Sequence, residues 1–144
     1  MEYAIFNQPI VTIYEVPAEM RDTPAGPRSA IADEGLYGMV CQVRAVGDEN
    51  TPGGLPAGWA EIVTIYGYHG YVRAGQLTVT GEGKLRGWLS SRYNLIGRTA
   101  DVLAAPDSSA PCYMTLERGA LIERRPERRP GEPDNGNPVR QEGD

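Results

Sequence analysis

The chain has 144 residues, enough for one ordinary domain or two small modules, and this length excludes a multidomain enzyme. It contains 18 Gly and 12 Pro, which interrupt every long hydrophobic pattern, so long helices are not expected. The formal net charge is -5 and Lys84 is the one lysine. This balance argues against binding to nucleic-acid phosphates.

No stretch has the basic and apolar regions of a signal peptide, and none reaches the length of a membrane-spanning helix. We therefore expect no membrane partner. The cytoplasm is the default location, with the cell wall as the alternative if a parent protein is exported. Cys41 and Cys112 have neither the spacing of a metal site nor the number needed for a disulfide framework. No metal and no cofactor are expected.

From residue 9 to residue 80, short β-branched and aromatic runs alternate with Pro and Gly clusters. Such spacing is typical of a small barrel or sandwich, and it predicts an all-β fold. In the run LYGMVCQVRAV, the residues Met39, Cys41 and Val43 share one phase, while Gln42 and Arg44 share the other. A period of two predicts a half-buried strand.

Two local features of residues 9–80 carry further predictions. The run SAIADE, from Ser29 to Glu34, has helical propensity over one or two turns. The segment from Tyr68 to Gly70 lies between two aromatic strands and is predicted to form a tight hairpin, with Gly70 taking the positive φ that such a turn needs.

Residues 81–92 have the composition of a linker, in which Leu85, Trp88 and Leu89 are expected to dock on the barrel. Residues 93–123 predict strand, Pro-containing loop, strand, turn and strand, and they echo the first module as a diverged repeat. About thirty residues are too few to close a second barrel. This second module is therefore expected to be partial.

Residues 124–144 contain Val139 as their one aliphatic residue, among Arg, acidic residues, Pro and Gly. Such a segment cannot bury enough apolar surface to offset the entropy of ordering, so we expect a disordered tail. It begins where the second module still needs a hairpin and a closing strand. The chain is therefore expected to be either a fragment or a natural truncation.

The run GWAEIVTIYGYHGYV, from Gly58 to Val72, resembles the signature of a bacterial SH3 domain, and ADEGLYGM, from Ala32 to Met39, is similar to the strand entry of that family. With the weaker repeat over residues 100–120, the order resembles the N-terminal SH3 pair of NlpC-type cell-wall cysteine peptidases. Those γ-D-glutamyl-L-diamino acid endopeptidases cleave peptidoglycan stem peptides. The resemblance implies an SH3-like barrel over residues 9–80, without the catalytic domain that follows in the family.

The resemblance also implies a ligand site. The first SH3 module of these peptidases lends an acidic residue and a Tyr to the substrate cleft, where they hold the free amino end of the stem peptide. The matching positions are Glu34 and Tyr68, with Tyr66 and Tyr71 as competitors. A carboxylate recognises an ammonium through charge-assisted hydrogen bonds. Trp59 either lines the ligand groove of the barrel or packs inside it.

Catalysis is not expected from these residues. A Cys–His site needs a partly exposed thiolate within hydrogen-bond reach of an imidazole. His69 is the only His, and the phases of Cys41 and Cys112 predict that both thiols point inward on their strands. The chain is therefore predicted to be non-catalytic and to hydrolyse no peptide bond.

Two functions remain. The first is an SH3-like module that binds or positions a peptidoglycan stem peptide for a cell-wall cysteine peptidase. The second is a free-standing SH3-like domain that recruits a protein or peptide through a Tyr and Trp groove. The expected partners are the stem peptide or a missing peptidase domain. The incomplete second module leaves unpaired strand edges, so self-association is also expected.

Overall fold

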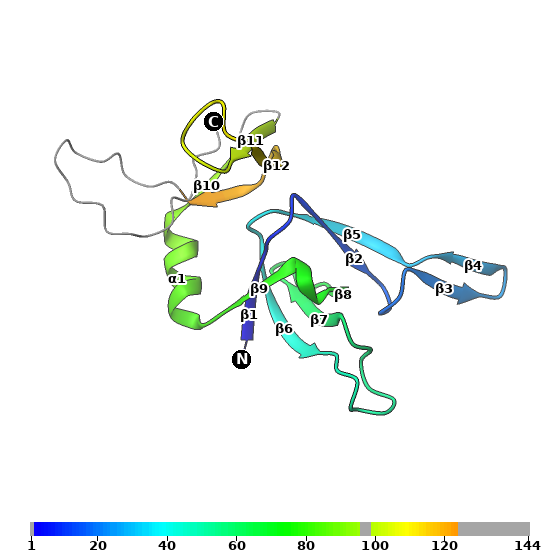
Figure 1. The fold of residues 1–144 in the computed structure, drawn as a ribbon. Coiled ribbons are helices and arrows are strands. Elements are labelled where there is room, and N and C mark those ends of the chain that lie inside the picture. The colour runs from blue at the N-terminus through cyan, green and yellow to red at the C-terminus, as the bar shows by residue number, and fades with distance from the viewer. Residues whose placement is uncertain (1, 96–98, 124–144) are drawn as a thin grey trace.

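The computed structural model describes residues 2–95 and 99–123, and within them the chain is mostly β-structure (Figure 1), which confirms the all-β prediction. The strands are β1 (Glu2–Phe6), β2 (Ile10–Tyr14), β3 (Met20–Thr23), β4 (Gly26–Ser29), β5 (Ile31–Leu36), β6 (Val40–Val46), β7 (Trp59–Thr64), β8 (His69–Arg73), β9 (Leu77–Thr80), β10 (Arg92–Asn94), β11 (Thr99–Leu103), β12 (Cys112–Glu117) and β13 (Leu121–Glu123). The helical segments are the 3₁₀ turn η1 (Ala74–Gln76) and the helix α1 (Glu82–Ser91).

The largest sheet has seven strands in the order β5-β2-β8-β7-β6-β1-β9, and its ladders are antiparallel. Strand β1 lies inside this sheet, between β6 and β9, although it precedes residue 9, where the sequence predicted the first module to begin. The end strands β5 and β9 share no ladder in the described residues. Backbone pairing therefore does not close this sheet into the barrel that the sequence predicted.

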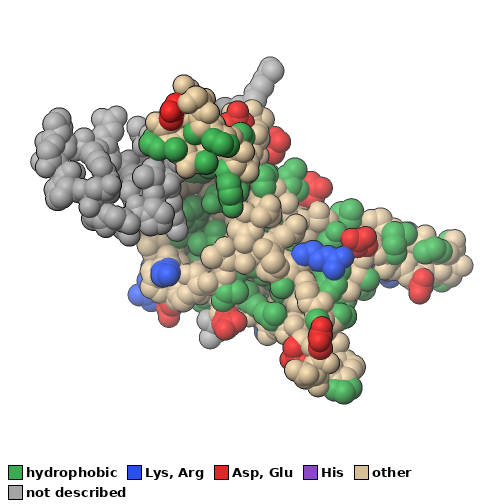
Figure 2. All heavy atoms as spheres, viewed as in Figure 1, with side chains coloured by type: hydrophobic (Ala, Val, Ile, Leu, Met, Phe, Trp, Pro, Cys, Tyr) green, Lys and Arg blue, Asp and Glu red, His purple; other side chains and the backbone are tan. Residues whose placement is uncertain are grey.

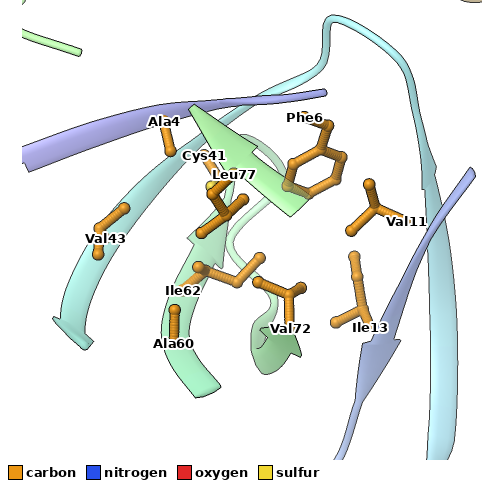
Figure 3. Close-up of a cluster of buried hydrophobic side chains, with 10 residues drawn as sticks. All are labelled: Ala4, Phe6, Val11, Ile13, Cys41, Val43, Ala60, Ile62, Val72 and Leu77. Atoms are coloured by element: carbon orange, nitrogen blue, oxygen red, sulfur yellow. The ribbon is translucent and has the colours of Figure 1, made fainter. Parts of the chain in front are cut away.

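The main core lies inside the curl of this sheet (Figure 3). Its buried side chains come from alternate positions of facing strands, as the period of two requires. They are Ala4, Phe6, Val11, Ile13, Cys41, Val43, Ala60, Ile62, Val72 and Leu77. A Cβ at Gly35 would lie 2.1 Å from Cε2 of Phe6, so the β5 backbone can approach the Phe6 ring only because residue 35 is glycine.

The predicted helical turn over Ser29–Glu34 is wrong, because most of this run lies in β5. Five residues of β5 pair with β2, from Ile31 opposite Tyr14 to Leu36 opposite Ile10. The energy of this ladder exceeds the small helical preference of SAIADE, since tertiary context overrides propensity. Residues 31–34 are exposed along this edge of the sheet.

The predicted hairpin turn is displaced by a few residues. The turn lies between Thr64, which ends β7, and His69, which begins β8, and Gly67 takes the positive φ of 83°. Gly70 is buried inside β8, opposite Ile62. The pairing of Val63 with His69 fixes this register, and it leaves no turn position for Gly70.

Most of the predicted linker forms the helix α1. The helix was not predicted because its glycines, at positions 83 and 87, interrupt the helical spacing of apolar residues. Leu85 and Trp88 are buried on one face at helical spacing, where they pack with Val40. Docking is therefore confirmed for these two residues. Leu89 is 43% exposed, so its predicted docking is wrong.

Beyond α1, strands β10 and β13 form one two-stranded sheet, and β11 and β12 form another. Strands β11, β12 and β13 follow the predicted order of strand, loop, strand, turn and strand, and β10 is an additional short strand before them. A small cluster of its own holds this part together: Leu95, Ala100, Leu116 and Ala120. A backbone hydrogen bond of 2.8 Å from the Leu121 N–H to the Tyr37 carbonyl joins this part to the turn between β5 and β6.

The tail predicted at residues 124–144 lies outside the described residues. Within the described ranges, no helix has the length and apolar character needed to cross a membrane.

Candidate functional site

An acidic residue and a tyrosine meet where the edge strand β5 passes the β7–β8 turn. The Tyr66 hydroxyl donates a hydrogen bond of 2.5 Å to Oδ2 of Asp33. The other oxygen of this carboxylate, Oδ1, accepts the backbone N–H of Glu34 at 2.8 Å. The two segments are 33 residues apart in the sequence, so the fold creates this corner. We call Asp33, Glu34 and Tyr66 the acidic corner.

The electrostatics of the acidic corner keep a negative charge at the surface. The Tyr66 hydroxyl, and then the Glu34 N–H, hold the pKa of Asp33 below its ordinary value of 3.8. Burial, and then the neighbouring Asp33, raise the pKa of Tyr66. Tyr66 therefore remains a donor and Asp33 an anion at neutral pH.

Within the described residues the acidic corner has no cationic partner, a property that it shares with other exposed acids such as Asp101 and Asp107. Among the residues that the structure describes, neither Asp33 nor Glu34 belongs to an ion pair. By contrast, Glu15 pairs with two arginines, which hold down its pKa mainly through the hydrogen bond from Arg21. An exposed, ionised carboxylate with no cationic partner among the described residues can receive a cation from a ligand.

The residues predicted from the sequence are only partly brought together. Glu34 is exposed in the acidic corner, next to Asp33. Of the three tyrosines, Tyr66 is the one that contacts an acid here. Tyr68 packs against the main core and its backbone N–H donates to Thr64. No hydrogen bond joins Glu34 to Tyr68 in the described part of the chain.

Tyr71 lies within β8 rather than in the turn. It is half-buried and pairs with Tyr14 of β2 and Glu61 of β7. This places it in the middle of the sheet, away from the edge strand on which Asp33 lies. The structure therefore gives Tyr71 no contact with the acidic corner.

Sequence reasoning missed Asp33. Asp33 and Gly35 face Ile13 and Val11 of β2, so they share the core-facing phase, whereas Glu34 faces Thr12 in the other phase. Asp33 lies at the end of the main core, and its side chain on this face of β5 contacts Tyr66. The alternation along β5 was a usable signal, but the expected helical turn hid it.

Trp59 is a packing residue in this structure. It is 5% exposed, and its ring forms a T-shaped contact with the Tyr14 ring at a centroid distance of 5.1 Å and an interplanar angle of 84°. The guanidinium carbon of Arg73 lies 4.0 Å from the Trp59 ring centroid, and Arg73 also pairs with Glu19 at 3.1 Å. A ligand could reach this ring face only if Arg73 moved.

The two cysteines have different environments. Cys41 is buried, as predicted, and burial raises the pKa of its thiol to about 12. Cys112 is exposed, so its predicted inward orientation is wrong. A register shift next to its partner Leu103 breaks the alternation that relates it to Leu116. In the described residues, His69 forms no hydrogen bond with either thiol.

We expect one thiol per folded chain to react with a disulfide reagent such as Ellman's reagent at pH 8, and the second only after unfolding. Cys112 reacts because it is exposed, whereas the buried Cys41 has almost no thiolate. Absorbance of the released thiolate measures the stoichiometry, and Cys112→Ser should lower it to near zero. Two fast equivalents in the native protein would show that the core around Cys41 is open.

The described residues contain no cluster of three or more His, Cys, Asp or Glu side chains that could hold a metal ion. On the face of β5 that carries Asp33, the acidic corner offers one carboxylate and one phenol oxygen to a small organic cation.

A solved structure has a fold similar to that of this chain, whereas the sequence of this chain matches no known family. No model of a protein family matches the chain, and no curated protein does. The chain is similar to the crystal structure of an NlpC/P60 family protein from Bacillus cereus ATCC 10987, with a TM-score of 0.57 and 14% identity. The match covers 88% of this chain and 48% of that one, so this chain spans about half the length of that protein. At this identity the likeness shows a shared fold.

Proposed function

We propose that the chain is a non-catalytic, SH3-like module that positions a peptidoglycan stem peptide for a cell-wall peptidase. The observation that carries the proposal is the acidic corner, where the Asp33 carboxylate is ionised and has Tyr66 but, among the described residues, no cation beside it. The fold shared with an NlpC/P60 family protein supports the choice of ligand. A peptidase domain is the partner that this role requires.

The chemistry of the corner suits a peptide's free amino group. An ammonium has three N–H donors and no acceptor. The Asp33 carboxylate accepts from it, and the Tyr66 oxygen can also accept, because its own proton is already donated to Asp33. The site is exposed and screened by solvent, so the binding is expected to be weak and selective for an unblocked amine.

The test is a titration of the chain with L-Ala-γ-D-Glu-diamino acid, followed by NMR of the backbone amides. We expect shifts at residues 33–34 and 66, and about tenfold weaker binding for Asp33→Asn, which corresponds to about 1.4 kcal/mol. Tyr66→Phe should also weaken binding. The same peptide with an acetylated amino end should bind at least tenfold more weakly, because it loses the α-ammonium of its first residue and keeps only the side-chain ammonium of the diamino acid.

Asp101→Asn is the matched control. Asp101 is also exposed and accepts a hydroxyl hydrogen bond, from Thr115 at 2.7 Å, but it lies in β11. This variant should bind like the parent chain. Equal affinity for the acetylated peptide, or equal loss in the two Asp variants, would refute the proposal. Loss of binding in Tyr68→Phe but not in Tyr66→Phe would show that Tyr68, the tyrosine that the sequence favoured, contacts the ligand.

The pH dependence of binding is a separate prediction. The folded-state pKa of Asp33 is lowered, so its carboxylate stays ionised down to its ordinary value of 3.8 and the acid limb of the binding curve lies below it. Binding should also fall above about pH 8, where the peptide's α-amino group loses its proton. Carboxyl NMR shifts of Asp33 measure the acid limb. Tyr66→Phe removes the largest cause of the lowered pKa and should move this limb to higher pH.

The alternative function is a free-standing SH3-like interaction domain. It requires an open aromatic groove at Trp59, and that ring is covered by Arg73 and Tyr14. The acidic corner needs no such rearrangement, so we favour it. Recruitment of a protein that survives Asp33→Asn but is lost when Trp59 is replaced would support the alternative.

A further inference from the structure

An apolar cavity of about 530 Å³ lies between the main sheet and the β11–β12 hairpin. Figure 2 shows hydrophobic side chains gathered where this hairpin meets the rest of the molecule. The walls include Ile5 and Trp88 on one side and Val102, Leu103 and Met114 on the other. A volume of this size is in the range of ligand sites, and nothing in the proposed function uses it.

One rim of the cavity is an unpaired strand edge. Thr78 of β9 lines the cavity, and β9 is the last strand of the seven-stranded sheet. Val79 pairs with the buried Ala4, so it belongs to the core-facing phase, yet it is 51% exposed. A core-facing apolar side chain is uncovered because no strand lies beyond β9 in the described residues.

A strand added to β9 would therefore meet apolar surface on both of its faces. On the core side its residues would cover Val79, and on the other side they would enter the cavity beside Ile5, which pairs with Thr78. A strand buried on both faces consists of consecutive apolar residues rather than alternating ones. This sets the chemistry of the occupant.

The charges of the residues that line the cavity also favour an apolar occupant. Glu123 is the one charged residue among the described residues that line the cavity, and Arg92 lies opposite it in the β10–β13 ladder. Opposite charges at this end leave little net field, so the lining favours an uncharged occupant over a fatty-acid anion or a basic peptide.

These 144 residues contain no free segment of this kind. The sequence after Glu123 contains one aliphatic residue, Val139. Apolar runs such as IVTIY already lie in the main sheet, so a second copy would have to unfold one of its own strands to supply one. We infer that an extended segment from outside these 144 residues, with about four consecutive uncharged apolar residues, binds here by adding a strand to β9.

The test uses the peptide acetyl-Lys-Lys-Val-Ile-Val-Ile-Lys-Lys-amide, whose lysines keep it soluble. Isothermal titration should show binding, and amide hydrogen exchange should show at least tenfold greater protection in β9. A peptide with Ser-Gly-Ser-Gly in place of the apolar residues carries the same charge and should not bind. Proline in place of the first isoleucine removes a backbone donor and should weaken binding at least tenfold.

Two variants of the chain separate the edge from the cavity. Val79→Glu puts a carboxylate on the edge, and Ala104→Trp fills the cavity from an exposed lining position. Each should weaken binding at least fivefold. Val46→Glu is the control, because Val46 is 50% exposed and lies in β6, outside the lining. The peptide is cationic, so added carboxylates could only strengthen non-specific attraction.

Three outcomes would overturn the inference. The first is binding that survives both Val79→Glu and Ala104→Trp, and the second is no binding at millimolar peptide. The third is a dimer, formed without peptide and abolished by Val79→Glu, because the occupant would then be a second copy. None of these results bears on the acidic corner, since Asp33 lies on β5, at the opposite end of the strand order.

Discussion

Trp88→Ala is expected to lower the free energy of unfolding by about 3–5 kcal/mol, the usual cost of removing a buried large aromatic side chain. Trp88 is 8% exposed and packs with Val40 and Leu85 at the junction of α1 and the main sheet. Its indole N–H donates a buried hydrogen bond of 2.8 Å to the Gly38 carbonyl. The substitution leaves a cavity and removes the partner of that carbonyl, and both effects destabilise.

Chemical denaturation followed by circular dichroism measures the loss. Leu89→Ala is the matched control, one residue further along the same helix but 43% exposed, and it should cost less than about 1 kcal/mol. Hydrogen exchange should also become faster in β11 and β12 of Trp88→Ala, because the junction no longer holds them. If the two variants had equal stability, the helix would not be the connection between the two parts.

The strands of the main sheet were predictable where the period of two was clean. The alternation of Met39, Cys41 and Val43 predicted the orientation of β6, and Cys41 is buried as expected. Successive side chains of a strand point to opposite faces of the sheet, so the burial of one residue fixes the face of the other residues in that strand. The same argument failed at Cys112, because a register shift in the β11–β12 ladder interrupts the alternation.

The helix and the acidic corner were not predictable in the same way. Helix α1 has a weak apolar pattern, since Leu85 and Trp88 are its only buried residues and Gly87 lies between them. Its stability comes from docking rather than from propensity. The contact of Asp33 with Tyr66 depends on the β2–β5 register and on the exact position of the β7–β8 turn. Neither is fixed by local sequence, so the acid was assigned one residue too late.

The junction also depends on a single glycine. Gly38 has a φ of 84°, and its N–H donates to the Phe6 carbonyl while its own carbonyl accepts from Trp88. A Cβ at this position would lie 2.2 Å from the Leu121 carbonyl oxygen, which is closer than real Cβ contacts allow. Gly38 is therefore required both by its conformation and by the backbone of β13 beside it.

Gly38→Ala is expected to destabilise the chain by about 3–4 kcal/mol: about 1–2 kcal/mol for the left-handed conformation, and the remainder for displacing β13. Gly58→Ala is the control, because Gly58 has a φ of 85° and no atom within 4 Å of its Cβ position. Gly58→Ala should therefore lose only the free energy that the left-handed conformation costs. Thermal and chemical unfolding give the difference between the two variants, which reports the contact with Leu121. Equal losses would mean that β13 moves away from Gly38 at no cost, and that the second part of the chain is only loosely attached.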